Sequence, residues 1–230
     1  MDNKNKNVFL SLSDTKKQKI LLLDYDAGNI RSFVNALNIV NGKFFSYELI
    51  ITIAKEGEKH DYENYDILII PGVGRFEACM EKLSWAKDMI NNHIQSGKKI
   101  LGVCVGMQIL SDFGYEGKKT SGLTIIPGEV KGLVVPDNVK LPHVGWKNID
   151  ILRAHPIFQN IGNQPHFYFV HSYHFIPKFA KNIYATVEYG GIQITSIVGT
   201  ENIFGFQFNP EKSGVTGQII LKNFINLRPV

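Results

Sequence analysis

One stretch of sequence indicates the fold: KILGVCVGMQI, residues 99–109. Its first half is an apolar run that ends in Gly-Val-Cys-Val-Gly, and its second half has the pattern of a helix. This order predicts a strand that turns abruptly into a helix, with Cys104 at the apex. Gly102 and Gly106 leave room for such a sharp turn. A helix N-terminus beside the thiol stabilises the thiolate, so the stretch has the layout of a nucleophile elbow with Cys in place of Ser.

A second interpretation of Cys104 stays open at this point. Free cysteines are often plain core residues, so the thiol can also be a packing group in a buried turn. The chain has one other cysteine, Cys79, and two cysteines do not make a disulfide framework. A reducing, cytoplasmic location fits this cysteine usage best.

The bulk composition is that of a globular chain. At 230 residues it can form one large domain or two small ones. The hydrophobic fraction of 44% and the charged fraction of 20% are ordinary for a soluble protein. No apolar stretch approaches the roughly 18 residues of a transmembrane helix. The N-terminus has neither the apolar core nor the cleavage site of a secretory signal. We expect no membrane partner.

The net charge of +4 is concentrated in one segment. Residues 1–19 hold five lysines and two aspartates, and so contribute +3 of that charge. The remaining residues are nearly neutral, so the basic balance indicates a solvated leader rather than a nucleic-acid-binding patch. We expect no nucleic-acid partner.

Alternating strand and helix patterns fill the first half of the chain. Residues 1–18 are predicted to be an extension with at most one short strand, Val8-Phe9-Leu10. Strands are expected at residues 20–23, near 48–53, at 65–70 and up to Cys104, and helices from Ile30 to Asn41-Gly42 and from Phe76 to Ile90. This alternation favours a mostly parallel sheet with helices on both faces. Residues 26–29, residues 71–74 and Cys104 follow strand ends, so they should be neighbours.

Beyond Gly114 the helical periodicity fades and short apolar runs predict strands. They lie at residues 123–126, 167–170, 183–187, 192–198 and 203–208. Their tight connections indicate antiparallel additions to the parallel sheet. A last helix is expected from Gly214 to Leu227. No linker or repeat interrupts the chain, so we predict a single α/β domain over residues 19–230.

Four motifs together resemble the class I (triad) glutamine amidotransferases. They are Pro71-Gly72-Val73-Gly74, the stretch from Leu101 to Gln108, YFVHSY at residues 168–173, and GFQFNPEKS at residues 205–213. Asp24-Tyr25 with Gly28-Asn29, and LPHVGW at residues 141–146, narrow the resemblance to the glutaminase subunits of imidazole glycerol phosphate synthase, from histidine biosynthesis. The resemblance covers residues 19–227 and implies a flavodoxin-like fold.

The resemblance implies a mechanism and roles for the motif residues. Cys104 attacks the glutamine side-chain amide, forms a thioester and releases ammonia. The oxyanion needs fixed N–H donors, which the Val105 backbone and the Gly72-Val73-Gly74 loop would supply, the latter after a peptide flip. Gln108 and the His171-Ser172 stretch would hold the substrate. For His171, as for His143, a structural or substrate-side role is favoured over a triad role.

One departure from the family pattern concerns the general base. The family has Phe-His-Pro-Glu where this chain has Phe-Asn-Pro-Glu, so Asn209 stands at the triad histidine and Glu211 at the triad carboxylate. Asparagine cannot act as a base near neutral pH. Losing a general base typically costs about 10²–10⁴-fold, although a cysteine is intrinsically very nucleophilic. Two explanations remain: an engineered replacement that blocks turnover, or a natural subunit that binds and activates without hydrolysing glutamine.

The resemblance also implies a partner for the released ammonia, a (β/α)₈-barrel synthase subunit in a heterodimer. By motif match, Asn29, Trp146, Tyr168 and Lys212 would lie at or near that interface, and Lys212 can pair with a partner carboxylate. Amidotransferases that feed amidino-sugar synthesis for surface polysaccharides remain an alternative, as does a stand-alone thiol hydrolase.

No cofactor is expected. No His/Cys cluster has the spacing of metal ligands. The Gly72-Val73-Gly74 motif lacks the third glycine of a dinucleotide fingerprint, which argues against a bound nucleotide.

Overall fold

The structure, a computed structural model, describes residues 17–45 and 47–228. A central sheet of eight strands runs through it. These strands are β1 (Lys17–Asp24), β2 (Glu48–Lys55), β3 (Ile67–Ile70), β4 (Lys99–Val103), β9 (Asp150–Ile151), β12 (Ile183–Tyr189), β13 (Ile192–Gly199) and β14 (Ile203–Phe206). Their order in the sheet is β2-β1-β3-β4-β14-β13-β12-β9.

The sheet is parallel in its first part and antiparallel in its last. All pairs from β2 to β14 are parallel. The pairs from β14 to β9 are antiparallel. The predicted α/β class, a mostly parallel sheet with antiparallel additions in the C-terminal half, is confirmed. Every residue of β3 and β4 is buried, as expected for strands covered on both faces.

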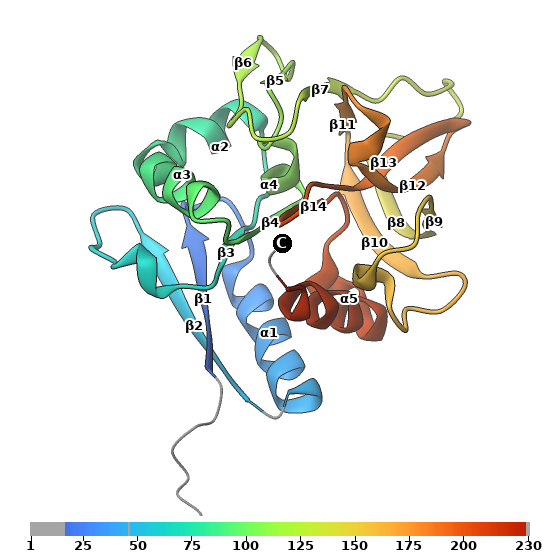
Figure 1. The fold of residues 1–230 in the computed structure, drawn as a ribbon. Coiled ribbons are helices and arrows are strands. Elements are labelled where there is room, and N and C mark those ends of the chain that lie inside the picture. The colour runs from blue at the N-terminus through green and yellow to red at the C-terminus, as the bar shows by residue number, and fades with distance from the viewer. Residues whose placement is uncertain (1–16, 46, 229–230) are drawn as a thin grey trace, which may run out of the picture.

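Helices cover both faces of the central sheet. On one face, α1 (Ile30–Phe44) and α5 (Gly214–Asn226) lie side by side, and on the other lie α2 (Phe76–Lys82) and α3 (Lys87–Gln95) (Figure 1). The buried residues of α1 recur at helical spacing and so form one apolar face, as the sequence predicts: Phe33, Ala36, Leu37 and Val40. No helix in the described ranges is long and apolar enough to cross a membrane.

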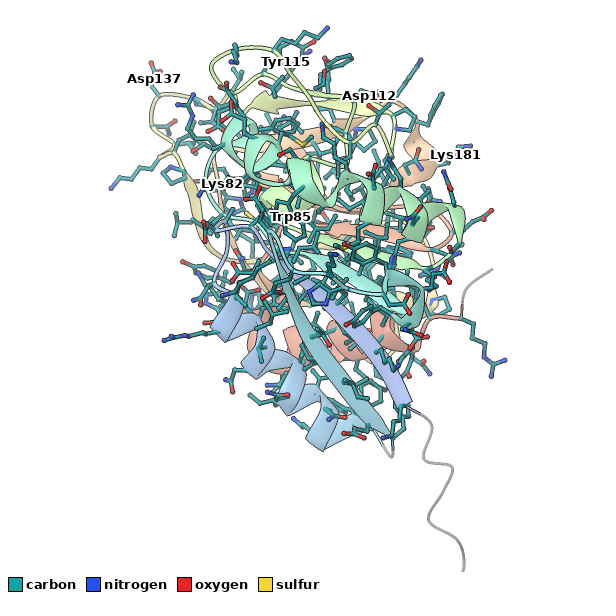
Figure 2. The ribbon with its side chains drawn as sticks, turned by 90° about the vertical axis from the view of Figure 1, so that its left-hand side faces the viewer. Lys82, Trp85, Asp112, Tyr115, Asp137 and Lys181 are labelled. Atoms are coloured by element: carbon teal, nitrogen blue, oxygen red, sulfur yellow. The ribbon has the colours of Figure 1, made fainter. Side chains whose placement is uncertain are left out.

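Two smaller sheets flank the C-terminal half. One pairs β8 (His143–Asn148) with β10 (His166–His171). The other has the order β11-β7-β5-β6, made of β11 (Tyr173–Pro177), β7 (Gly128–Gly132), β5 (Phe113–Gly114) and β6 (Thr120–Ser121). Tyr115, which follows β5, lies at the end of the molecule opposite α1 (Figure 2). These sheets contribute Val170, His171 and Tyr173 to the lining of the pocket described below.

Two predicted elements differ from the observed ones. The helix expected from Phe76 to Ile90 is interrupted after Lys82. Leu83 leaves the helical region with ψ near 0°, and its carbonyl accepts the N–H of Ala86 at 3.0 Å in a tight turn. Both side chains are buried there. The turn therefore lets α2 and α3 meet the sheet separately.

The strand expected at residues 123–126 is absent from the described structure. This segment instead ends the helix after Cys104. The N–H of Leu123 donates to Ile109 O at 2.8 Å, and the N–H groups of Ile125 and Ile126 both donate to Leu110 O. A helix C-terminus leaves carbonyls without partners, and these N–H groups satisfy them. Thr124 bends the segment with a φ of +55°.

The predicted N-terminal extension lies almost entirely outside the described residues, including the strand Val8-Phe9-Leu10. Lys17 and Gln18, which belong to the proposed extension of residues 1–18, form the start of β1.

Candidate active site

Cys104 sits between β4 and the short helix α4 (Val105–Gln108). Its φ of +55° and ψ of −112° are unusual for a residue with a side chain and cost about 1–3 kcal/mol. Two glycines make the turn possible. A Cβ on Gly106 would lie 1.9 Å from Ile70 O, and one on Gly102 would lie 2.3 Å from Gly106 O. The predicted elbow, with the cysteine at its apex, is therefore present.

The Cys104 thiol is buried, with 4% of the residue exposed. Its Sγ lies 3.7 Å from Val170 O, and Gln207 Nε2 lies 3.9 Å from Sγ. The thiol pKa is raised to about 12, mainly by burial; Glu211 contributes to the increase, while the Val105 N–H and Lys212 act in the opposite direction. The stabilisation expected from the helix N-terminus is thus outweighed, because α4 has only four residues and the thiol is desolvated. The resting thiol is protonated.

A pocket of about 380 Å³ opens onto Cys104. Eight of the predicted site residues line it: Val73, Gly74, Cys104, Val105, Gln108, His171, Ser172 and Lys212. Glu116, Pro142, Val170 and Tyr173 complete the lining. Gly72, Asn209, Glu211, Asn29, Trp146 and Tyr168 were also predicted at the site or interface, and they lie outside this lining.

The turns after β1, β3 and β4 are neighbours, as predicted from the parallel sheet. A Cβ on Gly28 would lie 3.4 Å from Pro71 Cβ, and one on Gly72 would lie 2.5 Å from Gly106 N. Gly72 is therefore the close-packing residue of its loop rather than a pocket residue. Lys82 (labelled in Figure 2) donates to Asp26 O at 3.2 Å and ties the turn after β1 to α2.

Two hydrogen bonds to backbone carbonyls fix the loop at residues 71–74. The buried Tyr25 hydroxyl donates to Pro71 O. The Cys79 thiol donates to Val73 O at 3.7 Å. Gly74 has a φ of +101° and open space around its Cα, so it permits the turn by conformation rather than by size.

Gln108 presents one atom to the pocket. Its Nε2 donates to Tyr173 O at 2.9 Å and to Gln207 Oε1 at 3.1 Å. Both amide hydrogens are therefore used within the protein. The carbonyl Oε1 is the part of Gln108 that a bound molecule can reach.

His171 forms a pair with His143 rather than facing Cys104 as a base. His171 Nδ1–H donates to Tyr173 O at 2.9 Å, so its Nε2 accepts from His143 Nδ1–H at 3.0 Å. Burial lowers the pKa of His171 to about 3 and that of His143 to about 4. An imidazole of such low pKa is a poor base at neutral pH. Both rings are buried, and His171 also lines the pocket; the structural or substrate-side role of each stays a prediction.

Asn209 and Glu211 follow β14 and are joined by a side-chain hydrogen bond. Asn209 Nδ2 donates to Glu211 Oε1 at 3.0 Å. The backbone of Asn209 is fixed as well, because its N–H donates to Tyr168 O at 2.9 Å and its carbonyl accepts from Ser213 Oγ at 2.7 Å. Burial raises the pKa of Glu211. Lys212 lines the same pocket as Cys104, and Glu211 and Lys212 both shift the pKa of the Cys104 thiol.

Three of the four predicted interface residues form one surface cluster. The Trp146 and Tyr168 rings meet edge to face with centroids 6.1 Å apart, and Lys212 Nζ lies 5.7 Å from the Tyr168 ring centroid. Half of Trp146 is exposed. Asn29 lies at another turn, where its Oδ1 accepts from Ser32 N at 3.2 Å and caps α1.

Two residues of the site were missed from the sequence. Glu116 lines the pocket, where its Oε2 accepts the Phe76 N–H at 2.7 Å and Arg75 Nε lies 4.0 Å from its Oε1. It belongs to an irregular loop with no motif, so only the tertiary fold reveals it. Gln207 stands two residues before Asn209, inside a quoted motif, and its position was the available signal. Within the described ranges, no group of His, Cys, Asp and Glu has the arrangement of a metal site.

Comparisons with known proteins agree with this geometry. The family model for Glutamine amidotransferase class-I matches residues 21–227. The imidazole glycerol phosphate synthase subunit HisH of Caldanaerobacter subterraneus is 41% identical over 205 residues, covering 88% of this chain and 95% of the relative. HisH of Pelagibacter ubique is 38% identical over 213 residues, 90% of this chain and 99% of the relative.

Solved structures share the fold at low sequence identity. PurLQS from Thermotoga maritima superimposes with a TM-score of 0.67 at 18% identity, over 92% of this chain and 99% of that chain. A glutamine amidotransferase from Thermotoga maritima gives a TM-score of 0.61 at 14% identity, over 91% and 98%. A cysteine held at a strained strand-to-helix turn and a family match along nearly the whole sheet lead to one assignment: the chain belongs to the class I glutamine amidotransferase family.

Proposed function

We propose that this chain is the glutaminase subunit of an imidazole glycerol phosphate synthase, where it supplies ammonia for histidine biosynthesis. The observation that carries the proposal is the Cys104 elbow at a pocket that also presents backbone donors and polar side chains. The HisH relatives support this ammonia acceptor over an amidino sugar, because they match 88% and 90% of this chain.

The pocket suits glutamine at both ends. The side-chain amide would lie at Cys104, beside the Val105 N–H and the loop at residues 72–74. Gln108 Oε1 and the Glu116 carboxylate are acceptors that suit the α-ammonium group. The Ser172 hydroxyl and the backbone next to His171 would hold the α-carboxylate. These assignments rest on which polar residues line the pocket together with Cys104.

The chemistry would run through a thioester. Cys104 Sγ attacks Cδ of glutamine, and the C–S bond forms while the carbonyl becomes an oxyanion beside the Val105 N–H. The C–N bond then breaks and the leaving nitrogen takes the proton that the thiol lost, giving ammonia. Water hydrolyses the thioester to glutamate and regenerates the thiol.

Asn209 makes the proton transfer slow in this chain. With a thiol pKa of about 12, only about one cysteine in 10⁴ or fewer is ionised at pH 7.5. Asn209 cannot take the proton. His171, the imidazole in the described pocket lining, has a pKa of about 3. This supports a second candidate function, a protein that binds glutamine and its partner but hydrolyses poorly.

The partner would be a (β/α)₈-barrel synthase in the cytoplasm, docked on the cluster of Trp146, Tyr168 and Lys212, with Asn29, an exposed residue at the turn before α1, as a further contact. An exposed tryptophan packed on a partly buried tyrosine beside a cation is typical of interface hot spots. We also propose that residues 19–230 form one domain and that no cofactor takes part.

Glutaminase activity with the barrel partner and its nucleotide substrate tests the proposal. We compare the unaltered chain, Cys104→Ala, Asn209→His and the double variant. The proposal expects weak activity, no activity, strong activity and no activity, respectively. Activity that survives Cys104→Ala would overturn the nucleophile. Full activity in the unaltered chain, with no gain from Asn209→His, would overturn the proposed impairment.

A further inference from the structure

We infer that Gln207 is a positioning residue of the glutaminase site: one end of its amide orients Gln108, and the other donates a hydrogen bond to the sulfur of Cys104. The inference rests on the proposed function in that Cys104 is the nucleophile. It adds a residue to which neither the motif comparison nor the family match assigns a role.

The sheet brings Gln207 to the nucleophile. It follows the last residue of β14, and β14 pairs in parallel with β4, the strand that ends before Cys104. The Cys104 N–H donates to Phe206 O at 2.7 Å, and the Gln207 N–H donates to Ser196 O at 2.9 Å on the other side. The peptide unit that joins Phe206 to Gln207 is therefore fixed at both its carbonyl and its N–H.

The hydrogen bonds define which end of the Gln207 amide faces the sulfur. Gln207 Oε1 accepts from Gln108 Nε2 at 3.1 Å, so that end must be the carbonyl. The Nε2 end then lies 3.9 Å from Cys104 Sγ, as a donor. Gln207 is fully buried, with 0% exposed, so no water competes for either end.

The carbonyl end determines what Gln108 offers to the pocket. Gln108 Nε2 is held by Gln207 Oε1 and by Tyr173 O. If the first acceptor is lost, the Gln108 amide is free to turn and its Oε1 no longer has a fixed direction. The expected consequence is weaker glutamine binding.

The donor end acts on the ionised sulfur. A buried thiolate needs hydrogen-bond donors, and in this chain the triad position holds Asn209 rather than an imidazole. Three titratable or charged groups shift the pKa of the Cys104 thiol: Glu211 and Cys79 raise it and Lys212 lowers it. The thiol in turn contributes to the raised pKa of Tyr25. Of the three groups, Lys212 is the one that stabilises the thiolate. Among the amide donors, the Val105 N–H lowers the pKa of the thiol, and Gln207 Nε2–H, 3.9 Å from Sγ, is the side-chain amide donor to the sulfur.

The test is the rate at which iodoacetamide alkylates Cys104 between pH 6 and pH 10, read by peptide mass spectrometry so that Cys79 is counted separately. Gln207→Glu keeps the acceptor toward Gln108 and replaces the donor toward sulfur by an oxygen. Gln207→Met keeps the length and removes both ends. Gln193→Glu, at an exposed position near the start of β13, adds the same charge outside the lining of the Cys104 pocket.

We expect Gln207→Glu to slow alkylation at pH 8 by about tenfold or more, since a hydrogen bond to a charged group is worth about 1.5–3 kcal/mol. Gln207→Met should slow it in the same direction and by less, and Gln193→Glu should match the unaltered chain. If iodoacetamide alkylates Cys104 in Gln207→Glu at the rate of the unaltered chain, the donor role is overturned. If Gln207→Glu does not fold, the same result in Gln207→Met overturns it.

A second readout separates the two ends of the amide. In the Asn209→His background, where turnover is fast enough to measure, Gln207→Met should raise KM at least about fivefold because Gln108 loses its orientation. Gln207→Glu should lower kcat with KM within about twofold. Equal effects of the two variants on KM would overturn the orienting role. The alkylation readout needs no turnover, so its result is separate from a failure of the proposed glutaminase.

Discussion

Asn209 and Glu211 form a buried pair that is only half satisfied. Asn209 Nδ2 donates to Glu211 Oε1 at 3.0 Å, while Asn209 Oδ1 and Glu211 Oε2 have no hydrogen-bond partner within the described protein. A histidine at position 209 could hold a proton between this carboxylate and the thiol, whereas an asparagine ends the chain of donors. The pair therefore keeps the contact between positions 209 and 211 without the base.

Restoring the histidine should restore catalysis, and Glu211 should decide how far. We expect Asn209→His to raise glutaminase kcat by about 10²–10⁴-fold. In the Glu211→Gln background the same change should gain about tenfold less, because the neutral amide stabilises the imidazolium less well. Steady-state kinetics of the unaltered chain, the two single variants and the double variant, each in complex with the partner, give the coupling energy between positions 209 and 211. Equal gains in both backgrounds would show that Glu211 does not orient the base.

The strained backbone at Cys104 should be measurable as stability. Its φ of +55° is a region that glycine adopts freely. We expect Cys104→Gly to unfold at a higher temperature than Cys104→Ala, corresponding to about 1 kcal/mol, because both remove the thiol and only glycine removes the strain. Thermal unfolding followed by circular dichroism compares them. Alanine as stable as glycine would mean that the elbow carries no strain.

Substitution by alanine should have opposite effects on stability at two glycines. Gly106→Ala places a Cβ 1.9 Å from Ile70 O, so it should destabilise the protein by at least about 2 kcal/mol and abolish glutaminase activity. Gly42→Ala, on an exposed turn of α1 with nothing within 4 Å, should stabilise it by about 0.5–1 kcal/mol. Urea unfolding measures both. If Gly106→Ala is as stable as Gly42→Ala, the elbow is not close-packed.

Buried histidines should make the protein sensitive to acid. Burial lowers the pKa of His93 to about 4, so the folded state keeps this ring neutral while the unfolded state binds a proton below pH 6.5. Its stabilising contribution is complete above pH 6.5 and is lost as the pH falls toward 4, on the order of 2 kcal/mol by pH 4.5. Urea unfolding of His93→Leu at pH 7.5 and pH 4.5 should show a smaller loss than the unaltered chain. An identical loss would exclude His93 as the cause.

The central sheet could be predicted because its strands carry an unambiguous signal. A continuous apolar run such as residues 67–70 has few alternatives to a strand buried on both faces. The break after Lys82 could not be predicted, since Phe76 to Ile90 keeps a helical pattern and only packing against the sheet favours two pieces. The predicted strand at residues 123–126 is wrong for a related reason. Their apolar side chains suit a strand, but their N–H groups cap the helix after Cys104.

The motifs placed the site residues that follow strands, and they were less informative about side-chain contacts. Gln108 was predicted to face substrate, and the hydrogen bonds that restrict it to one free atom come from Tyr173 and Gln207. Glu116 carries no local pattern and reaches the pocket only through the tertiary fold. The high thiol pKa depends on the burial of Cys104, which local sequence does not encode.

The place of β14 in the sheet has a consequence for how the protein is made. β14 is a central strand, yet its partner β4 lies about a hundred residues earlier, with Ile203 opposite Ile100. While the ribosome makes the residues between them, β4 has an open edge, and Cys104 lacks both the Phe206 carbonyl and Gln207. The nucleophile is therefore incomplete during most of synthesis. It becomes a defined site only when a late strand closes the middle of the sheet.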